Sequence, residues 1–61
     1  MFQTPLQIMP KWKVLDTGPA FTWQREVVIS AESRELAKSM YVAQCDAIGH
    51  VPHSILVFRT R

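Results

Sequence analysis

The residues best suited to chemistry are gathered in one short stretch near the C-terminal end of the chain. Cys45, Asp46, His50 and His53 place four potential metal ligands within nine residues. Zinc favours tetrahedral sites built from thiolate and imidazole ligands, so a cysteine at a helix end and two loop histidines could converge on an ion. The spacing matches no common structural zinc pattern, however, and Cys45 falls on the polar side of the predicted helix. We therefore expect no metal and no cofactor here, and both histidines are interpreted as residues of an exposed loop.

A cysteine with nearby histidines also raises the question of nucleophilic catalysis, which needs a base beside the nucleophile and a group that stabilises an oxyanion. A chain of 61 residues leaves little room for a substrate pocket of ~300 Å³ or more. With only two glycines, Gly18 and Gly49, a phosphate-binding glycine-rich loop is excluded. Nothing marks Asp16 and Asp46 as a carboxylate pair. The sequence thus predicts a non-enzymatic protein without catalytic residues.

Basic and aromatic residues alternate in the segments that are typical of strands. A basic sheet with exposed rings binds single-stranded nucleic acid in many small modules, through phosphate contacts and base stacking. The ordinary alternative is that the rings are core and the cations protect sheet edges. The candidate nucleic-acid contacts are Lys11, Trp12, Lys13, Trp23, Arg25, Arg59 and Arg61.

The elements that position these residues follow from the hydrophobic periodicity. Residues 11–15 alternate basic and apolar side chains and are typical of a strand, and residues 16–19 contain turn formers. Residues 21–29 are rich in aromatic and β-branched residues, which predicts the second strand of a hairpin. A helix is expected from Ser33, a good N-cap, to Ile48, with Gly49 ending it. The final strand spans residues 54–58, and passage over one strand would place it beside the first.

The helix is expected to bury a stripe that faces the sheet. On a helical wheel this stripe is widened by Ala37, Gln44 and Ile48, and Val42 and Cys45 fall on the outer face. Gln44 would then either bond to the backbone of the sheet or loop or mark a contact between the helix and a partner. The stripe itself consists of Leu36, Met40, Ala43 and Ala47.

The final strand, residues 54–58, is apolar at nearly every position, which is typical of a strand that is covered on both sides. A single helix covers only one face of a three-stranded sheet. The second face would carry either Ile55 and Val57 or Leu56 and Phe58. Its cover could be the apolar N-terminal arm, a second copy of the chain, or a different protein. The candidate interface residues are Phe2, Leu6, Ile8, Leu56 and Phe58.

Size and composition bound the remaining possibilities. We expect one α+β domain over residues 1–61, a ββαβ core over residues 11–61 preceded by an arm over residues 1–10. The formal charge of +2 permits nucleic-acid binding without requiring it. One cysteine excludes an internal disulfide and fits a reducing cytoplasm, and no segment resembles a signal peptide or a membrane span. The favoured hypothesis is a homodimeric protein-binding or regulatory module, such as an accessory protein of a phage or mobile element. The alternative is a nucleic-acid-binding module.

Overall fold

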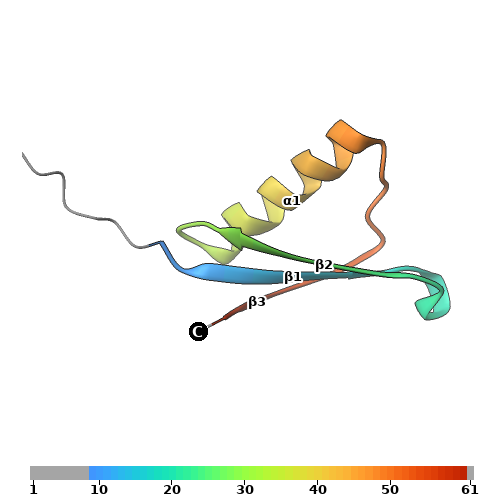
Figure 1. The fold of residues 1–61 in the computed structure, drawn as a ribbon, viewed down its shortest axis with the longest axis horizontal. Coiled ribbons are helices and arrows are strands. Elements are labelled where there is room, and N and C mark those ends of the chain that lie inside the picture. Colours follow the sequence, from blue (N-terminus) through green and yellow to red (C-terminus); the bar gives the residue numbers. More distant parts are fainter. Residues whose placement is uncertain (1–8, 61) are drawn as a thin grey trace, which may run out of the picture.

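The computed structural model of this protein describes residues 9–60 and has the ββαβ order that the sequence predicts. Both strand pairs of its single sheet are antiparallel, and the strand order is β2-β1-β3. Helix α1 lies across one face of the sheet (Figure 1). The predicted α+β fold, with the final strand beside the first, is therefore confirmed. The elements are β1 (Lys11–Thr17), a 3₁₀ turn η1 (Pro19–Phe21), β2 (Gln24–Ser30), α1 (Arg34–Ile48) and β3 (Ser54–Arg59).

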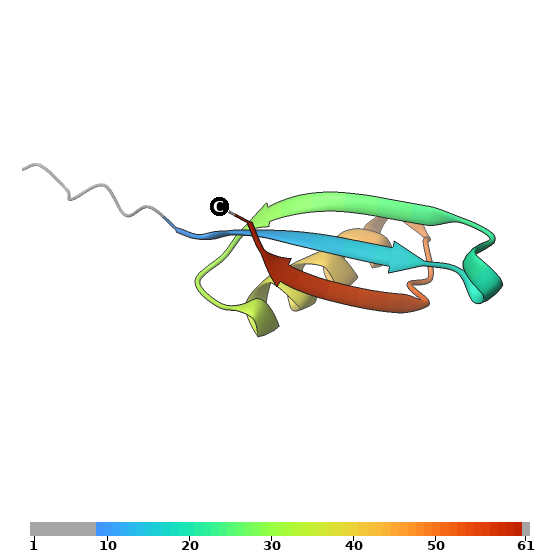
Figure 2. The same cartoon turned by 90° about the horizontal axis from the view of Figure 1, so that it is seen from below.

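Strand β1 is the centre of the sheet, with β2 and β3 as its edges (Figure 2). Its Val14 lies opposite Val27 of β2 and Val57 of β3. Because successive side chains of a strand point to opposite faces, this register fixes which residues share a face. Residues in phase with Val14 face α1, and the alternating set faces away from it.

Helix α1 begins and ends at the residues that the sequence predicts. The Ser33 hydroxyl accepts a hydrogen bond from the Leu36 N–H at 3.1 Å, which satisfies one of the free donors of the first turn. At the other end Gly49 takes the left-handed conformation, with φ at 73°. The His50 N–H then bonds back to the Cys45 carbonyl at 2.8 Å, which turns the chain out of the helix.

The buried face of α1 differs from the predicted stripe. The residues that α1 buries are Ala37, Tyr41 and Cys45, spaced four apart. The structure exposes five of the residues that were predicted to be buried: Leu36, Met40, Ala43, Ala47 and Ile48. The rest of the core cluster is Val14, Ile29 and Ala31, with Trp12, Val27, Ile55 and Val57 packed against it.

The predictions for Gln44 and Cys45 are also wrong. Gln44 is exposed rather than buried, and Cys45 is fully buried rather than on the outer face. The physical reason is that apolar residues occupy most of the circumference of α1, so the wheel alone could not select a face. The small Ala37 allows close approach to the sheet, and the Tyr41 hydroxyl has a partner there.

The hairpin also differs from the prediction in its boundaries. Strand β1 continues through Asp16 and Thr17, which the sequence assigned to a turn, and β2 begins at Gln24 rather than at Phe21. The Gly18 N–H donates to the Trp23 carbonyl at 2.9 Å and closes the loop. A glycine is required at position 18 because a Cβ there would overlap the Trp23 ring.

The tip of this loop carries backbone strain. Ala20 and Phe21 both have positive φ, at 51° and 57°, a region that favours glycine. The Phe21 side chain is exposed at this tip.

Within residues 9–60, no helix combines the length and the apolar character that crossing a membrane requires.

Candidate functional site

A buried carboxylate, Asp16, lies between the sheet and the end of the helix. Asp16 belongs to the face of β1 that packs under α1, and its side chain has no exposed area. One carboxylate oxygen, Oδ2, accepts a hydrogen bond from the Tyr41 hydroxyl at 2.7 Å. The other, Oδ1, accepts from the backbone N–H groups of His53 and Ser54 at 3.0 and 3.2 Å. Asp16 thus connects the central strand to the helix and to the loop that leads into β3.

The two loop histidines complete this network. His50 Nε2 lies 3.2 Å from Oδ2 of Asp16, and His53 Nδ1 lies 3.0 Å from the Thr17 carbonyl oxygen. A carbonyl oxygen and an ionised carboxylate only accept, so the contacting nitrogen of each ring carries the proton. The prediction that both histidines lie in an exposed loop is correct for His53, which is exposed, and wrong for His50. His50 is half-buried, and its ring meets that of Trp23 edge-on, with the centroids 4.9 Å apart.

Hydrogen bonding decides the charge state of Asp16. Burial alone would raise its pKa, because a charged carboxylate is disfavoured away from water. The four hydrogen bonds, with that from Tyr41 the largest contribution, favour the ionised form and hold the pKa of Asp16 below its ordinary value of 3.8. Burial, reinforced by the bond to Asp16 and by the neighbouring Cys45, raises the pKa of the Tyr41 hydroxyl. Tyr41 is therefore a permanent donor and Asp16 a permanent acceptor at neutral pH.

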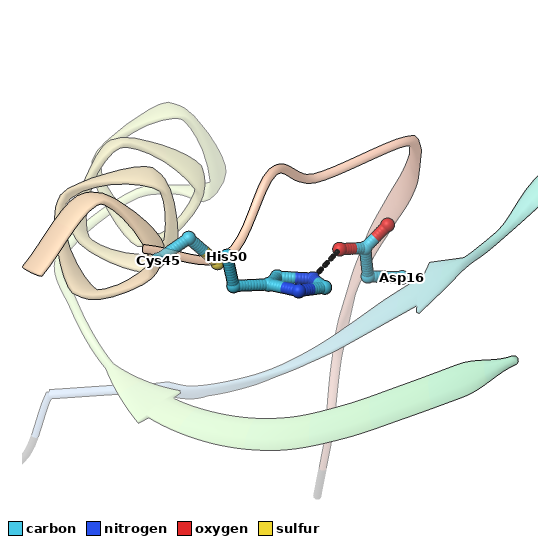
Figure 3. A group of neighbouring side chains, drawn as sticks. All are labelled: Asp16, Cys45 and His50. Carbon is cyan, nitrogen blue, oxygen red and sulfur yellow. Dashed lines mark hydrogen bonds and ion pairs between the residues drawn. The ribbon is translucent and has the colours of Figure 1, made fainter. Parts of the chain in front are cut away.

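Asp16, Cys45 and His50 form a possible metal-ligand group, with one ligand atom from each residue and all three atoms within 4.8 Å of one another (Figure 3). The sequence prediction had grouped Cys45 with Asp46, His50 and His53 instead. The structure leaves Asp46 exposed and away from Asp16. A metal ion bound to Oδ2 and Nε2 would have to break the bond between them. Since Asp16 already accepts at its four lone-pair positions, its hydrogen bonding is complete without an ion.

The same geometry argues against nucleophilic catalysis. The Cys45 side chain is fully buried, so a substrate could reach it only if the helix and loop separated. The Asp16–His50 pair resembles the base and orienting carboxylate of a hydrolase, but such a pair acts through a nucleophile that contacts substrate. The network is better explained as a structural connection between the loop of residues 49–53 and the sheet.

Sequence reasoning missed both Asp16 and Tyr41. The burial of Asp16 could have been predicted from the alternation of side chains along the strand. Asp16 follows Trp12 and Val14 at intervals of two and so lies on the same buried face. Turn-forming neighbours after Asp16 concealed this pattern.

The second candidate site is the sheet face away from α1, here called the open face (Figure 2). Leu56 and Phe58 lie on it, because their neighbours Ile55 and Val57 pack against the core on the other side. Val28, Leu56 and Phe58 expose 56%, 61% and 46% of their surface, which is high for large apolar residues in a sheet. The prediction that β3 is covered on both sides is not met by residues 9–60, which leave the open face uncovered.

Of the candidate interface residues, Leu56 and Phe58 are thus placed together on the open face. Phe2, Leu6 and Ile8 lie outside the described residues.

The candidate nucleic-acid contacts do not form one surface. Lys11 and Lys13 are on the open face, and the Lys13 ammonium lies 6.0 Å from the centre of the Phe58 ring. Arg25 and Arg59, by contrast, are in phase with residues that face α1. Arg61 lies outside the described residues.

Neither tryptophan is on the open face. The Trp12 indole N–H donates to the Ala31 carbonyl at 2.9 Å, and its ring packs against the core. The Trp23 ring lies against Gly18 and His50. Neither predicted aromatic contact is therefore placed for base stacking on the open face, where Phe58 is the aromatic residue among residues 9–60.

A shallow groove of about 260 Å³ runs between the start of α1 and β3. Its floor comes from β3 and its rim from charged helix residues: it is lined by Arg34, Glu35, Lys38, Ile55, Leu56 and Val57. The polar side chains among these lining residues, Arg34, Glu35 and Lys38, are all exposed, so the groove offers no buried polar group of its own to position a small ligand.

In comparisons with known proteins, no family model, no curated protein and no solved structure matches this chain.

Proposed function

We propose that this protein is a small, non-enzymatic binding module that contacts another protein through the open face of its sheet. The observation that carries the proposal is the exposure of Val28, Leu56 and Phe58 together on one face of a folded sheet. Large apolar side chains that gather on one exposed face are typical of interaction sites. The proposal includes a cytoplasmic location, where the single thiol of Cys45 stays reduced.

Site-specific photo-crosslinking in the cells that produce the protein tests this proposal. A photoreactive phenylalanine analogue at position 58 should give a covalent adduct with one defined protein, which a second copy of the chain would satisfy. The matched control is the same analogue at Phe21, an equally apolar and more exposed residue at the hairpin tip. Equal labelling from both positions, or none from position 58, would show that the open face is not the binding surface.

Nucleic-acid binding is the second candidate function, favoured by the position of Lys11 and Lys13 beside Phe58 on the open face. With two cations there, log K should fall with log salt with a slope of only about 1.4, at ~0.7 per phosphate. Binding of a fluorescent single-stranded oligonucleotide should therefore be weak at ~150 mM salt. Sub-micromolar affinity under that condition would refute the protein-contact proposal and establish the second function in its place.

A further inference from the structure

Strand β3 is an edge of the sheet, and among residues 9–60 it pairs with β1 alone (Figure 2). The Thr60 N–H donates to the Lys11 carbonyl at 2.9 Å, so the backbone of Thr60 is directed toward β1. In an antiparallel ladder such residues alternate with residues whose N–H and C=O point away from the partner strand. The register therefore directs the backbone groups of Ile55, Val57 and Arg59 outward. These groups can pair with a further strand.

The outer edge of β3 lacks the features that usually prevent such pairing. Natural sheets protect their edges with charged residues, prolines or bulges. The segment from Ser54 to Phe58 contains no charge and no proline, and its register with β1 continues without a bulge. The edge formed by β2 differs. Counted from the bond between Gly18 and Trp23, the same alternation directs Glu26 outward there, so that edge carries a charge.

The groove of about 260 Å³ lies along the unprotected edge, between β3 and the start of α1. Its rim has two exposed cations, Arg34 and Lys38, and one exposed anion, Glu35. Arg59 is in phase with Val57 and adds a third cation to the same face of β3. Neither of the two ion pairs within residues 9–60 involves these three cations. The helix side of the edge is therefore cationic and lacks matching anions.

We propose that the partner docks as an extended segment that adds a fourth strand, antiparallel to β3, with acidic and apolar residues alternating along it. Because side chains alternate between faces, the acidic ones would lie beside Arg34, Lys38 and Arg59, and the apolar ones beside Leu56 and Phe58. In strand addition the backbone bonds provide affinity and the alternate side chains provide specificity. This inference rests on the proposed function, because the apolar half of the segment covers part of the open face.

Charge argues against a second copy of the chain at this edge. Two copies joined antiparallel along β3 would carry both helices on the same face of the joined sheet. The cations of the two rims, Arg34, Lys38 and Arg59 of each copy, would then lie on the same face near the junction, where like charges oppose association. An acidic segment instead supplies the anions that this face lacks. The antiparallel direction is preferred because both existing ladders of the sheet are antiparallel.

Hydrogen exchange in the presence of a synthetic peptide tests strand addition. The peptide alternates glutamate and valine and is long enough to span the six residues of β3. We expect a dissociation constant of about 100 μM, since a short segment buries little area. The peptide should slow amide exchange at Ile55, Val57 and Arg59. The amides of Glu26 and Val28, on the outer edge of β2, are the matched control and should exchange at unchanged rates.

Methylation of the peptide nitrogens tests the direction of the added strand. In antiparallel pairing, the residues bonded to β3 have side chains on the helix side, so they are the glutamates. N-methylation of the glutamates should therefore abolish the protection of β3, and N-methylation of the valines should preserve it. The opposite result would show parallel addition and refute the antiparallel arrangement.

Charge variants test the acidic preference, with binding followed by the anisotropy of a labelled peptide. Lys38→Gln and Arg59→Gln each remove one cation and should weaken binding about threefold. Gln44→Glu changes the net charge equally at an exposed position of α1 outside the groove and should leave the affinity unchanged. A peptide with lysine in place of glutamate should bind the natural chain at least about tenfold more weakly. Melting curves verify that each variant is folded.

The outcomes separate this inference from the proposed function. If the glutamate–valine peptide at about 1 mM leaves exchange at Val57 unchanged, strand addition is wrong, and crosslinking at position 58 still decides the proposed function. If the lysine peptide binds equally well, or if Lys38→Gln and Arg59→Gln have no effect, the acidic preference is wrong. If the peptide protects β3 but position 58 gives no defined adduct, the open face is not the contact and the proposed function fails.

Discussion

Asp16 joins separate segments of the described chain through its side chain. Its carboxylate accepts from the helix through the Tyr41 hydroxyl, from the loop through the His50 ring and the His53 N–H, and from the first residue of β3 through the Ser54 N–H. Each of those donors is removed from bulk water to some extent, and a buried donor without a partner costs about 1–3 kcal/mol. The stability of the whole domain therefore rests to an unusual degree on a single charged side chain.

Replacing Asp16 by asparagine should lower the free energy of unfolding by about 1–3 kcal/mol, because the amide nitrogen cannot accept from Tyr41 or His50. Asp16→Ala should cost more, since it leaves all four donors unpaired. Urea denaturation followed by tryptophan fluorescence measures both. The matched control is Asp46→Asn, on the exposed side of α1, which should change stability by less than ~0.5 kcal/mol. Equal effects at the two positions would contradict the role of Asp16.

The lowered pKa of Asp16 also predicts an acid limit to stability. Because the folded pKa lies below the ordinary value of 3.8, the unfolded chain binds the proton more readily. The contribution of Asp16 is then fully present above the unfolded pKa and is lost as the pH falls through 3.8 toward the folded value. The stability difference between the natural chain and Asp16→Asn should narrow over that window. A difference that is the same at pH 7 and at about pH 2 would show that folding does not lower the pKa of Asp16.

Among the secondary-structure elements, the ends of helix α1 could be predicted from the sequence, because they depend on residues close together in the chain. The two helix ends were predicted correctly because each depends on a local property of one residue. The Ser33 hydroxyl caps the first turn, and Gly49, which has no side chain, adopts the left-handed conformation. The buried face of α1 could not be predicted in the same way. It is decided by the contact between Tyr41 and Asp16, which are 25 residues apart in the chain. The same contact explains why Cys45, one turn after Tyr41, is buried.

Two substitutions at positive φ should change stability in opposite directions. Gly49→Ala places a Cβ in open space but in the left-handed conformation, so it should cost about 1 kcal/mol through strain alone. Ala20→Gly relieves that strain in the hairpin loop and should gain about 0.5 kcal/mol after the entropy of glycine is subtracted. Thermal denaturation of the two variants in one buffer gives both signs. A loss of stability in Ala20→Gly would mean that the loop is not strained at this residue.

For the whole molecule, the ββαβ order was predicted from the hydrophobic periodicity, which is two in the strands and 3.6 in the helix. The strand order was predicted from the usual path of the connection between the last two strands. The open face was predicted only as a pair of alternatives, Ile55 with Val57 or Leu56 with Phe58, because a continuous apolar strand does not reveal which side the helix covers. The structure resolves this in favour of Leu56 and Phe58 as the exposed pair. The network around Asp16 was beyond prediction, since it joins three segments whose approach is known only once the fold is known.

The stability of the whole domain should be independent of metal ions. The Asp16 network is complete through hydrogen bonds, so treatment with a strong chelator should leave the melting temperature unchanged. A zinc titration provides the complementary measurement, in which the natural chain and Cys45→Ser should show the same absence of a stabilising shift. Stoichiometric zinc in the purified protein, or a large fall in melting temperature with chelator, would show instead that Asp16, Cys45 and His50 form a metal centre.

The central position of β1 has a consequence for how the chain folds and opens. Its pairing with β2 closes a short hairpin, whereas its pairing with β3 joins Trp12 to Arg59 near the two ends of the chain. Local pairings form with a small loss of chain entropy and distant ones with a larger loss, so the distant pair limits the folding rate. Since both sides of β1 are occupied, its amide hydrogens can exchange with solvent only when a neighbouring strand departs. We expect the amides of β1 to be the slowest to exchange among the three strands, and those on the outer sides of β2 and β3 to exchange first.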